Sequence, residues 1–168
     1  MQKHKPIGII LIGIFLGTCG ISQLTYSLYT LIVEYYLGSS IGVIIDFLGI
    51  VAWFWLPIHG FVFGGLEQTY NQDFAFLVAR LVILSVGITS MVAMVAILKG
   101  LRLAWNLTLY LMLFEIFSSV SVIMLIPRSE HFINDIFVIM ILPIISVAIV
   151  YYLSKKNAKK YFHILPAS

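Results

Sequence analysis

Long runs of apolar residues, separated by short polar stretches, divide this chain into four segments that are each long enough to cross a membrane. A helix needs about 20 predominantly apolar residues to span the hydrocarbon core of a bilayer. The runs cover residues 7–33, 74–98, 103–126 and 136–153. This pattern predicts a single all-α integral membrane domain in which four transmembrane helices form a bundle.

The positions of the basic residues decide how a fifth apolar stretch, residues 41–66, is threaded. Basic residues beside apolar spans stay on the cytoplasmic side of a membrane. An even number of crossings must therefore separate each basic cluster from the next, which leaves 41–66 as an interfacial or re-entrant helical element on the outer side, with both termini cytoplasmic. The clusters lie at the N-terminus, between the second and third spans, and after the fourth: Lys3, Lys5, Lys99, Arg102, Lys155, Lys156, Lys159 and Lys160.

The first half of this outer element has a narrow face of polar or small residues. Asp46, Gly49 and Trp53 recur on it at helical spacing, and the rest of its circumference is apolar. Indole rings prefer the headgroup level, so we expect Trp53 and Trp55 to lie there. The apolar remainder would contact lipid or a partner protein.

Composition excludes a water-soluble domain and argues against nucleic acid as a partner. The chain has 168 residues, of which 61% are hydrophobic and 10% are charged, whereas soluble domains carry about 25% charged residues. The net charge of +3 comes from the flanks of the spans, where it suits anionic lipid headgroups and not nucleic acid. A multi-pass protein of the cytoplasmic membrane is predicted. Its one cysteine, Cys19, allows no intrachain disulfide.

One acidic residue, Glu115, lies close to the midpoint of the third span. An ionisable group at that depth usually faces protein, water or a counter-charge. Arg80 in the second span is the candidate counter-charge, and Ser118 and Ser119 share the helix face of Glu115. Three interpretations remain open: a site that handles protons or cations, a structural ion pair that holds the second and third spans in register, or a Glu115 that stays neutral.

Three glycines of the first span, Gly13, Gly17 and Gly20, form a small-residue stripe. Small residues at this spacing allow close helix packing in membranes. We expect the stripe to pack either within the bundle or against another subunit.

No pattern of reactive residues in the chain is typical of an enzyme. His59, Glu130 and His131 are among several possible metal ligands on the outer side, but their spacing matches no known metal motif. Phosphate-binding loops and nucleophile motifs are also absent from the sequence. We therefore predict no catalytic residue, no bound metal and no cofactor.

Three segments together resemble a known group of proteins. Residues 5–9 read KPIGI, residues 100–105 read GLRLAW, and residues 151–162 begin YYLSK and end KKYF. Small uncharacterised four-span membrane proteins of archaea and bacteria share such a start and such an end. The resemblance covers both ends and the middle hairpin but not residues 34–73. It implies a prokaryotic membrane and four spans, and it supplies no activity.

The function favoured by these features is that of a non-catalytic accessory subunit in a larger membrane assembly, for example a multi-subunit membrane oxidoreductase. Its partners would be other integral-membrane subunits and membrane lipids. Two alternatives remain: a small proton- or cation-linked carrier or channel that uses Glu115, and a membrane organiser that binds lipids through its basic tail.

Overall fold

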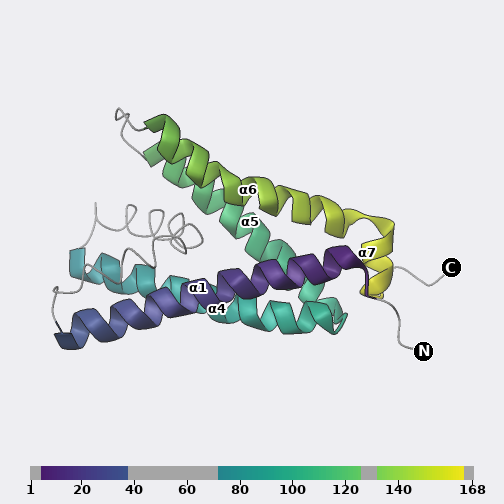
Figure 1. The fold of residues 1–168 in the computed structure, drawn as a ribbon, viewed down its shortest axis with the longest axis horizontal. Helices are drawn as coiled ribbons and strands as arrows, with labels where there is room; N and C mark the ends of the chain where they lie inside the picture. Colours follow the sequence, from purple (N-terminus) through teal and green to yellow (C-terminus); the bar gives the residue numbers. More distant parts are fainter. Residues whose placement is uncertain (1–4, 38–71, 126–131, 165–168) are drawn as a thin grey trace.

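The computed structural model describes residues 5–37, 72–125 and 132–164, and every regular element in these ranges is a helix (Figure 1). The predicted all-helical fold is confirmed for this part of the chain. The outer element predicted at 41–66, with Asp46, Gly49, Trp53 and Trp55, lies outside the described residues. The helices are α1 (Ile7–Leu37), α4 (Gln72–Leu98), α5 (Arg102–Leu125), α6 (Phe132–Ser154) and α7 (Lys156–Tyr161).

Three of these helices are long and apolar enough to cross a membrane, and a fourth is apolar over a shorter length. The three segments are Ile7–Ile32, Leu77–Leu98 and Arg102–Ile123, and the shorter one is Met140–Ser154 within α6. The exposure pattern is the reverse of that in a soluble bundle, because large apolar side chains such as Leu11 (60% exposed) and Phe117 (59% exposed) cover the outside. Such a surface is stable in lipid, which supports an integral membrane protein.

The helices form two pairs that diverge from a common end (Figure 1). Helices α1 and α4 are antiparallel and in contact over much of their length, and α5 packs on α6. Contact between α4 and α5 is less extensive. The main apolar core lies near the end that holds both described chain termini, where Leu16 and Ile97 meet Leu111 and Leu153.

A tight turn and the short helix α7 hold that end together. Gly100 adopts φ 70°, which lets the Leu101 amide donate to the Ala96 carbonyl and closes α4. The Tyr161 hydroxyl donates to the Leu98 carbonyl at 3.2 Å, and Phe162 beside it is fully buried. Partial burial here raises the pKa of the Tyr161 phenol, so this hydroxyl remains a donor at neutral pH. Helix α7 was not predicted from the sequence.

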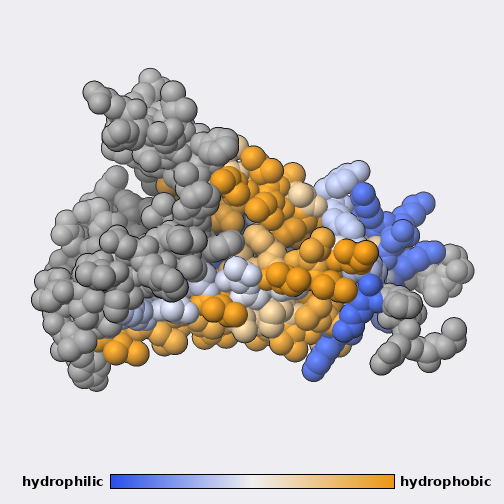
Figure 2. All heavy atoms as spheres, viewed as in Figure 1, coloured by the Kyte–Doolittle hydropathy of each residue, from blue (hydrophilic) through white to orange (hydrophobic). Residues whose placement is uncertain are grey.

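Basic side chains gather at the same end of the bundle. Figure 2 shows hydrophilic residues beside the chain termini and an apolar band along the helices. In the sequence, the basic residues at this end form three clusters that contain no acidic residue. In the described residues they are Lys5, Lys99, Arg102, Lys155, Lys156, Lys159 and Lys160.

Candidate functional site

The interior of the bundle contains a layer of polar side chains between the apolar surfaces of the helices. All of them are at most 8% exposed, and several belong to α1 and α5. They are Ser22, Gln23, Ser27, Thr30, Ser90, Thr108, Glu115, Ser118, Ser119 and Ser146. Polar groups inside a membrane bundle bind one another or mark a functional site, because lipid offers them no hydrogen bond.

Glu115 is the centre of this layer and bonds to α1. The Gln23 amide donates from Nε2 to Glu115 Oε1 at 3.2 Å, and both residues are buried. This is a contact between helices that are far apart in the sequence. It fixes the first span against the third at one level, since a buried amide and a buried carboxylate are both costly to leave without a partner.

The described contacts of Glu115 do not include Arg80, its predicted partner. Glu115 bonds to Gln23, whereas Arg80 interacts electrostatically with Tyr26 of α1. Among the contacts of the described residues, none joins Glu115 to Arg80. The helix register explains the separation: Gly87 of α4 faces Gln23, and Arg80 lies two helical turns, about 10 Å, from Gly87.

The two serines on the face of Glu115 are both fully buried but differ in their bonding. Ser118 Oγ donates to the backbone carbonyl of Glu115 at 3.1 Å and not to its carboxylate. Ser119 Oγ has no hydrogen bond in the described part of the chain, and the same holds for Ser27 Oγ and Glu115 Oε2. These three buried oxygen atoms can therefore still form hydrogen bonds at this site.

The glycine stripe of α1 packs within the bundle, against α4. A Cβ added at Gly13 would meet Leu98, one at Gly17 would meet Met94, and one at Gly20 would meet Met91. Of the two expected uses of the stripe, the internal one is therefore observed. The stripe gives α1 and α4 their close approach and leaves no free small-residue surface there for a partner.

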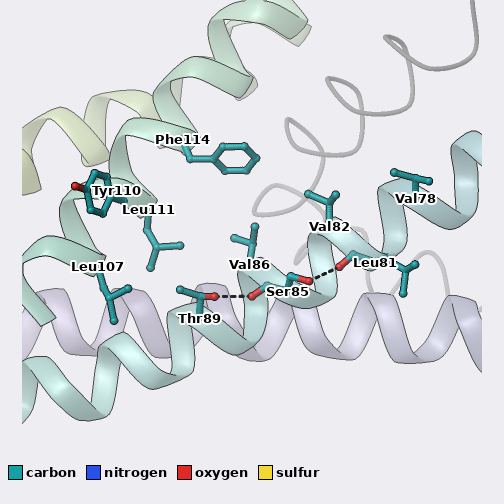
Figure 3. A pocket seen from close by; sticks show the side chains of 10 residues that line it. All are labelled: Val78, Leu81, Val82, Ser85, Val86, Thr89, Leu107, Tyr110, Leu111 and Phe114. Atoms are coloured by element: carbon teal, nitrogen blue, oxygen red, sulfur yellow. Dashed lines mark hydrogen bonds between the residues drawn. The ribbon is translucent and has the colours of Figure 1, made fainter. Parts of the chain in front are cut away.

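A groove of about 480 Å³ lies between α4 and α5, where the helix pairs diverge (Figure 3). Its walls are almost entirely apolar. Ser85 and Thr89 also line it, but their hydroxyls donate to the Leu81 and Ser85 carbonyls of their own helix. Tyr110 stands at its edge, 70% exposed, and its hydroxyl has no described hydrogen-bond partner. The ten lining residues are Val78, Leu81, Val82, Ser85, Val86, Thr89, Leu107, Tyr110, Leu111 and Phe114.

Gln23 was not predicted from the sequence, because a neutral amide in an apolar span stands out less than a charged residue. A signal was present, however. Cys19, Gln23 and Ser27 recur every fourth residue in the first span, which places three polar or polarizable side chains on one helix face. A polar stripe on a transmembrane helix predicts that this face is turned toward the protein interior.

The fold and the site together define an all-helical protein with three helices long and apolar enough to cross a membrane, a buried polar layer and a lateral apolar groove. Comparison with protein-family models, with curated proteins and with solved structures found no match to this chain.

Proposed function

We propose that this protein is a non-catalytic subunit of a larger integral-membrane assembly and that the groove between α4 and α5 receives a transmembrane helix of a partner subunit. The observation that carries the proposal is the apolar groove between the diverging helix pairs, with Tyr110, 70% exposed, at its edge. The orientation proposed with it places both termini on the cytoplasmic side of a prokaryotic cell membrane.

The depth of Tyr110 makes lipid a poor partner for it. Tyr110 lies about 12 Å along α5 from Arg102, and Arg102 is the basic residue at the start of that helix. The hydrocarbon core of a bilayer is about 30 Å thick, so the ring lies near its middle. A phenol prefers the headgroup level, and its hydroxyl finds no acceptor among acyl chains. A partner helix with a backbone or side-chain acceptor at this depth would satisfy it.

The shape of the groove fits the same partner. Its serine and threonine hydroxyls are already bonded to their own helix, so the floor presents an apolar surface to whatever fills it. Helices associate in membranes through van der Waals packing and a few interhelical hydrogen bonds. The groove supplies the surface for van der Waals packing, and Tyr110 at its edge supplies a hydroxyl for an interhelical hydrogen bond.

In-membrane photocrosslinking tests this docking site. A photoreactive residue at Val82 or Phe114, inside the groove, should crosslink to one integral-membrane chain, the same chain from both positions. Val92 is the matched control, since it is 52% exposed on α4 but does not line the groove. Tyr110→Phe, which removes only the hydroxyl, should lower the crosslinked fraction about fivefold, as expected for the loss of one hydrogen bond worth about 1 kcal/mol. Crosslinks to lipid alone, or equal crosslinking from Val92, would contradict the proposal.

Reporter fusions test the orientation. A reporter that is active only in the cytoplasm should be active when fused after residue 168 or inserted at Gly100, because the basic clusters beside both positions remain inside. Insertions near Gln68 and Ser129 should report the outside. An outside signal at Gly100 would show that residues 41–66 cross the membrane and that the threading proposed here is wrong.

A further inference from the structure

Within the buried polar layer, the oxygens nearest the Glu115 carboxylate have features of a ligand site that the subunit proposal does not use. Glu115 Oε1 accepts the Gln23 hydrogen bond, while Glu115 Oε2 is buried with no hydrogen bond in the described part of the chain. Ser119 Oγ and Ser27 Oγ also have no hydrogen bond in the described part of the chain, and both residues are fully buried. Buried polar atoms without a partner are rare in folded proteins, and each one calls for a ligand, a water or a proton.

These oxygens lie close in level along the bundle. Helices α1 and α5 both start at the end that holds the chain termini, so they run in the same direction (Figure 1). The Gln23–Glu115 hydrogen bond sets their register. Ser27 follows Gln23 by four residues and Ser119 follows Glu115 by four, so both hydroxyls lie about one helical turn, roughly 6 Å, beyond that bond.

The charge of Glu115 is not balanced by a described basic side chain. Arg80, on α4, interacts with Tyr26, and the basic clusters lie at the end of the bundle. Cys19 on α1 is a titratable side chain that interacts electrostatically with Glu115. From α6, the described buried polar residue is the neutral Ser146. A lone carboxylate inside a bilayer is costly, and one positive charge removes that cost.

We propose that Glu115 binds one hard monovalent cation, a proton or a sodium ion, where α5 meets α1, with Ser119 on the same helix face as the neighbouring neutral oxygen. Hard cations prefer oxygen ligands, and this site offers carboxylate and hydroxyl oxygens. A single positive charge gives a neutral site, whereas a divalent ion would leave an uncompensated charge in the membrane interior. The proposal is independent of the groove and of any partner in it.

Buried apolar residues fill the interior between this site and the end that holds the chain termini. Toward the chain termini, the interior is filled by a contiguous apolar core that includes Ile12, Leu16, Met112 and Ile149. Toward the other end, the buried residues of α1 continue as Ser27 and Thr30.

Thermal unfolding of the purified full-length protein tests the sodium form. NaCl should raise the Tm of the wild type in a saturable manner, because a ligand that binds only the folded state stabilises it. N-methylglucamine chloride at the same ionic strength should not. Ser119→Ala should raise the sodium concentration needed for half of the effect about tenfold, while Thr108→Ala, which also removes a buried hydroxyl of α5 without a described partner, should leave it unchanged. Glu115→Gln should abolish the response.

Carbodiimide labelling tests the proton form. A hydrophobic carbodiimide modifies protonated carboxyl groups, so labelling mapped to Glu115 by mass spectrometry should fall as pH rises, with no effect of sodium. In this form Ser119→Ala should displace the pH profile and Thr108→Ala should not. Protection from labelling by sodium would assign the site to sodium. A wild type whose Tm ignores sodium and whose labelling at Glu115 is absent or independent of pH would overturn the proposal, and would leave Glu115 and Gln23 as a structural contact.

Discussion

Replacement of Gly87 by leucine will lower the free energy of unfolding by at least about 2 kcal/mol, measured in detergent by chemical or thermal unfolding. The α1 backbone lies directly against this residue. A Cβ at Gly87 would lie 3.1 Å from the Leu24 backbone nitrogen and 3.1 Å from the Gln23 Cβ. Neither atom can move without its helix, so a leucine side chain must push α1 away from α4. Loss of this packing outweighs the gain of about 1 kcal/mol in helix propensity.

Two controls separate this effect from the general consequences of adding a side chain. A Cβ at Gly17 would meet the Met94 sulfur at 2.6 Å, but Met94 is flexible and can turn aside. Gly17→Ala should therefore change the stability by less than about 1 kcal/mol. Val92→Leu, on the exposed face of the same helix, should have almost no effect. A Gly87→Leu protein as stable as these controls would show that the close α1–α4 approach is wrong.

Because of these contacts, a bulky substitution in the glycine stripe does not test the binding of a partner directly. Because Gly13 and Gly17 face α4, a bulky residue there acts first on the fold of this chain. Release of a partner by Gly17→Leu would then report unfolding and not the loss of a docking surface. The groove positions of α4 and α5 are the ones that test docking directly.

The apolar helices could be predicted from the sequence because their signal is local and repeated. Three of the runs are long enough to cross a membrane, and many residues contribute to each, so no single position matters. The exact ends were less predictable: α1, for instance, continues to Leu37. Helix α7 was missed because a six-residue basic segment has no apolar run, and its docking depends on the tertiary contacts of Tyr161 and Phe162.

The candidate site was only half predictable, for a different physical reason. That Glu115 is buried followed from its position in an apolar span. Its partner depended on the relative register of three helices, which the spacing along one helix does not contain. The sequence made Arg80 plausible through its charge, but packing of Gly87 against Gln23 placed the neutral amide at the level of the carboxylate.

This register leads to a second prediction of large effect, a double-mutant cycle on Glu115 and Gln23. Glu115→Leu removes the acceptor of a buried amide, and Gln23→Leu removes the donor to a buried carboxylate. Each single change should lower the free energy of unfolding by about 1–3 kcal/mol, because the remaining partner stays buried without its hydrogen bond. The double variant leaves no orphaned group of the pair, so it should be no less stable than the worse single variant.

A parallel cycle on Glu115 and Arg80 should give the opposite result. Since Arg80 interacts with Tyr26 and lies about two turns from the level of Gln23, the effects of Arg80→Gln and Glu115→Leu should add within about 0.5 kcal/mol. Strong coupling in this cycle, with additivity between Glu115 and Gln23, would restore the ion pair expected from charge alone. It would also remove the basis of the cation site, because Arg80 would then supply the positive charge that Glu115 otherwise takes from a bound ion.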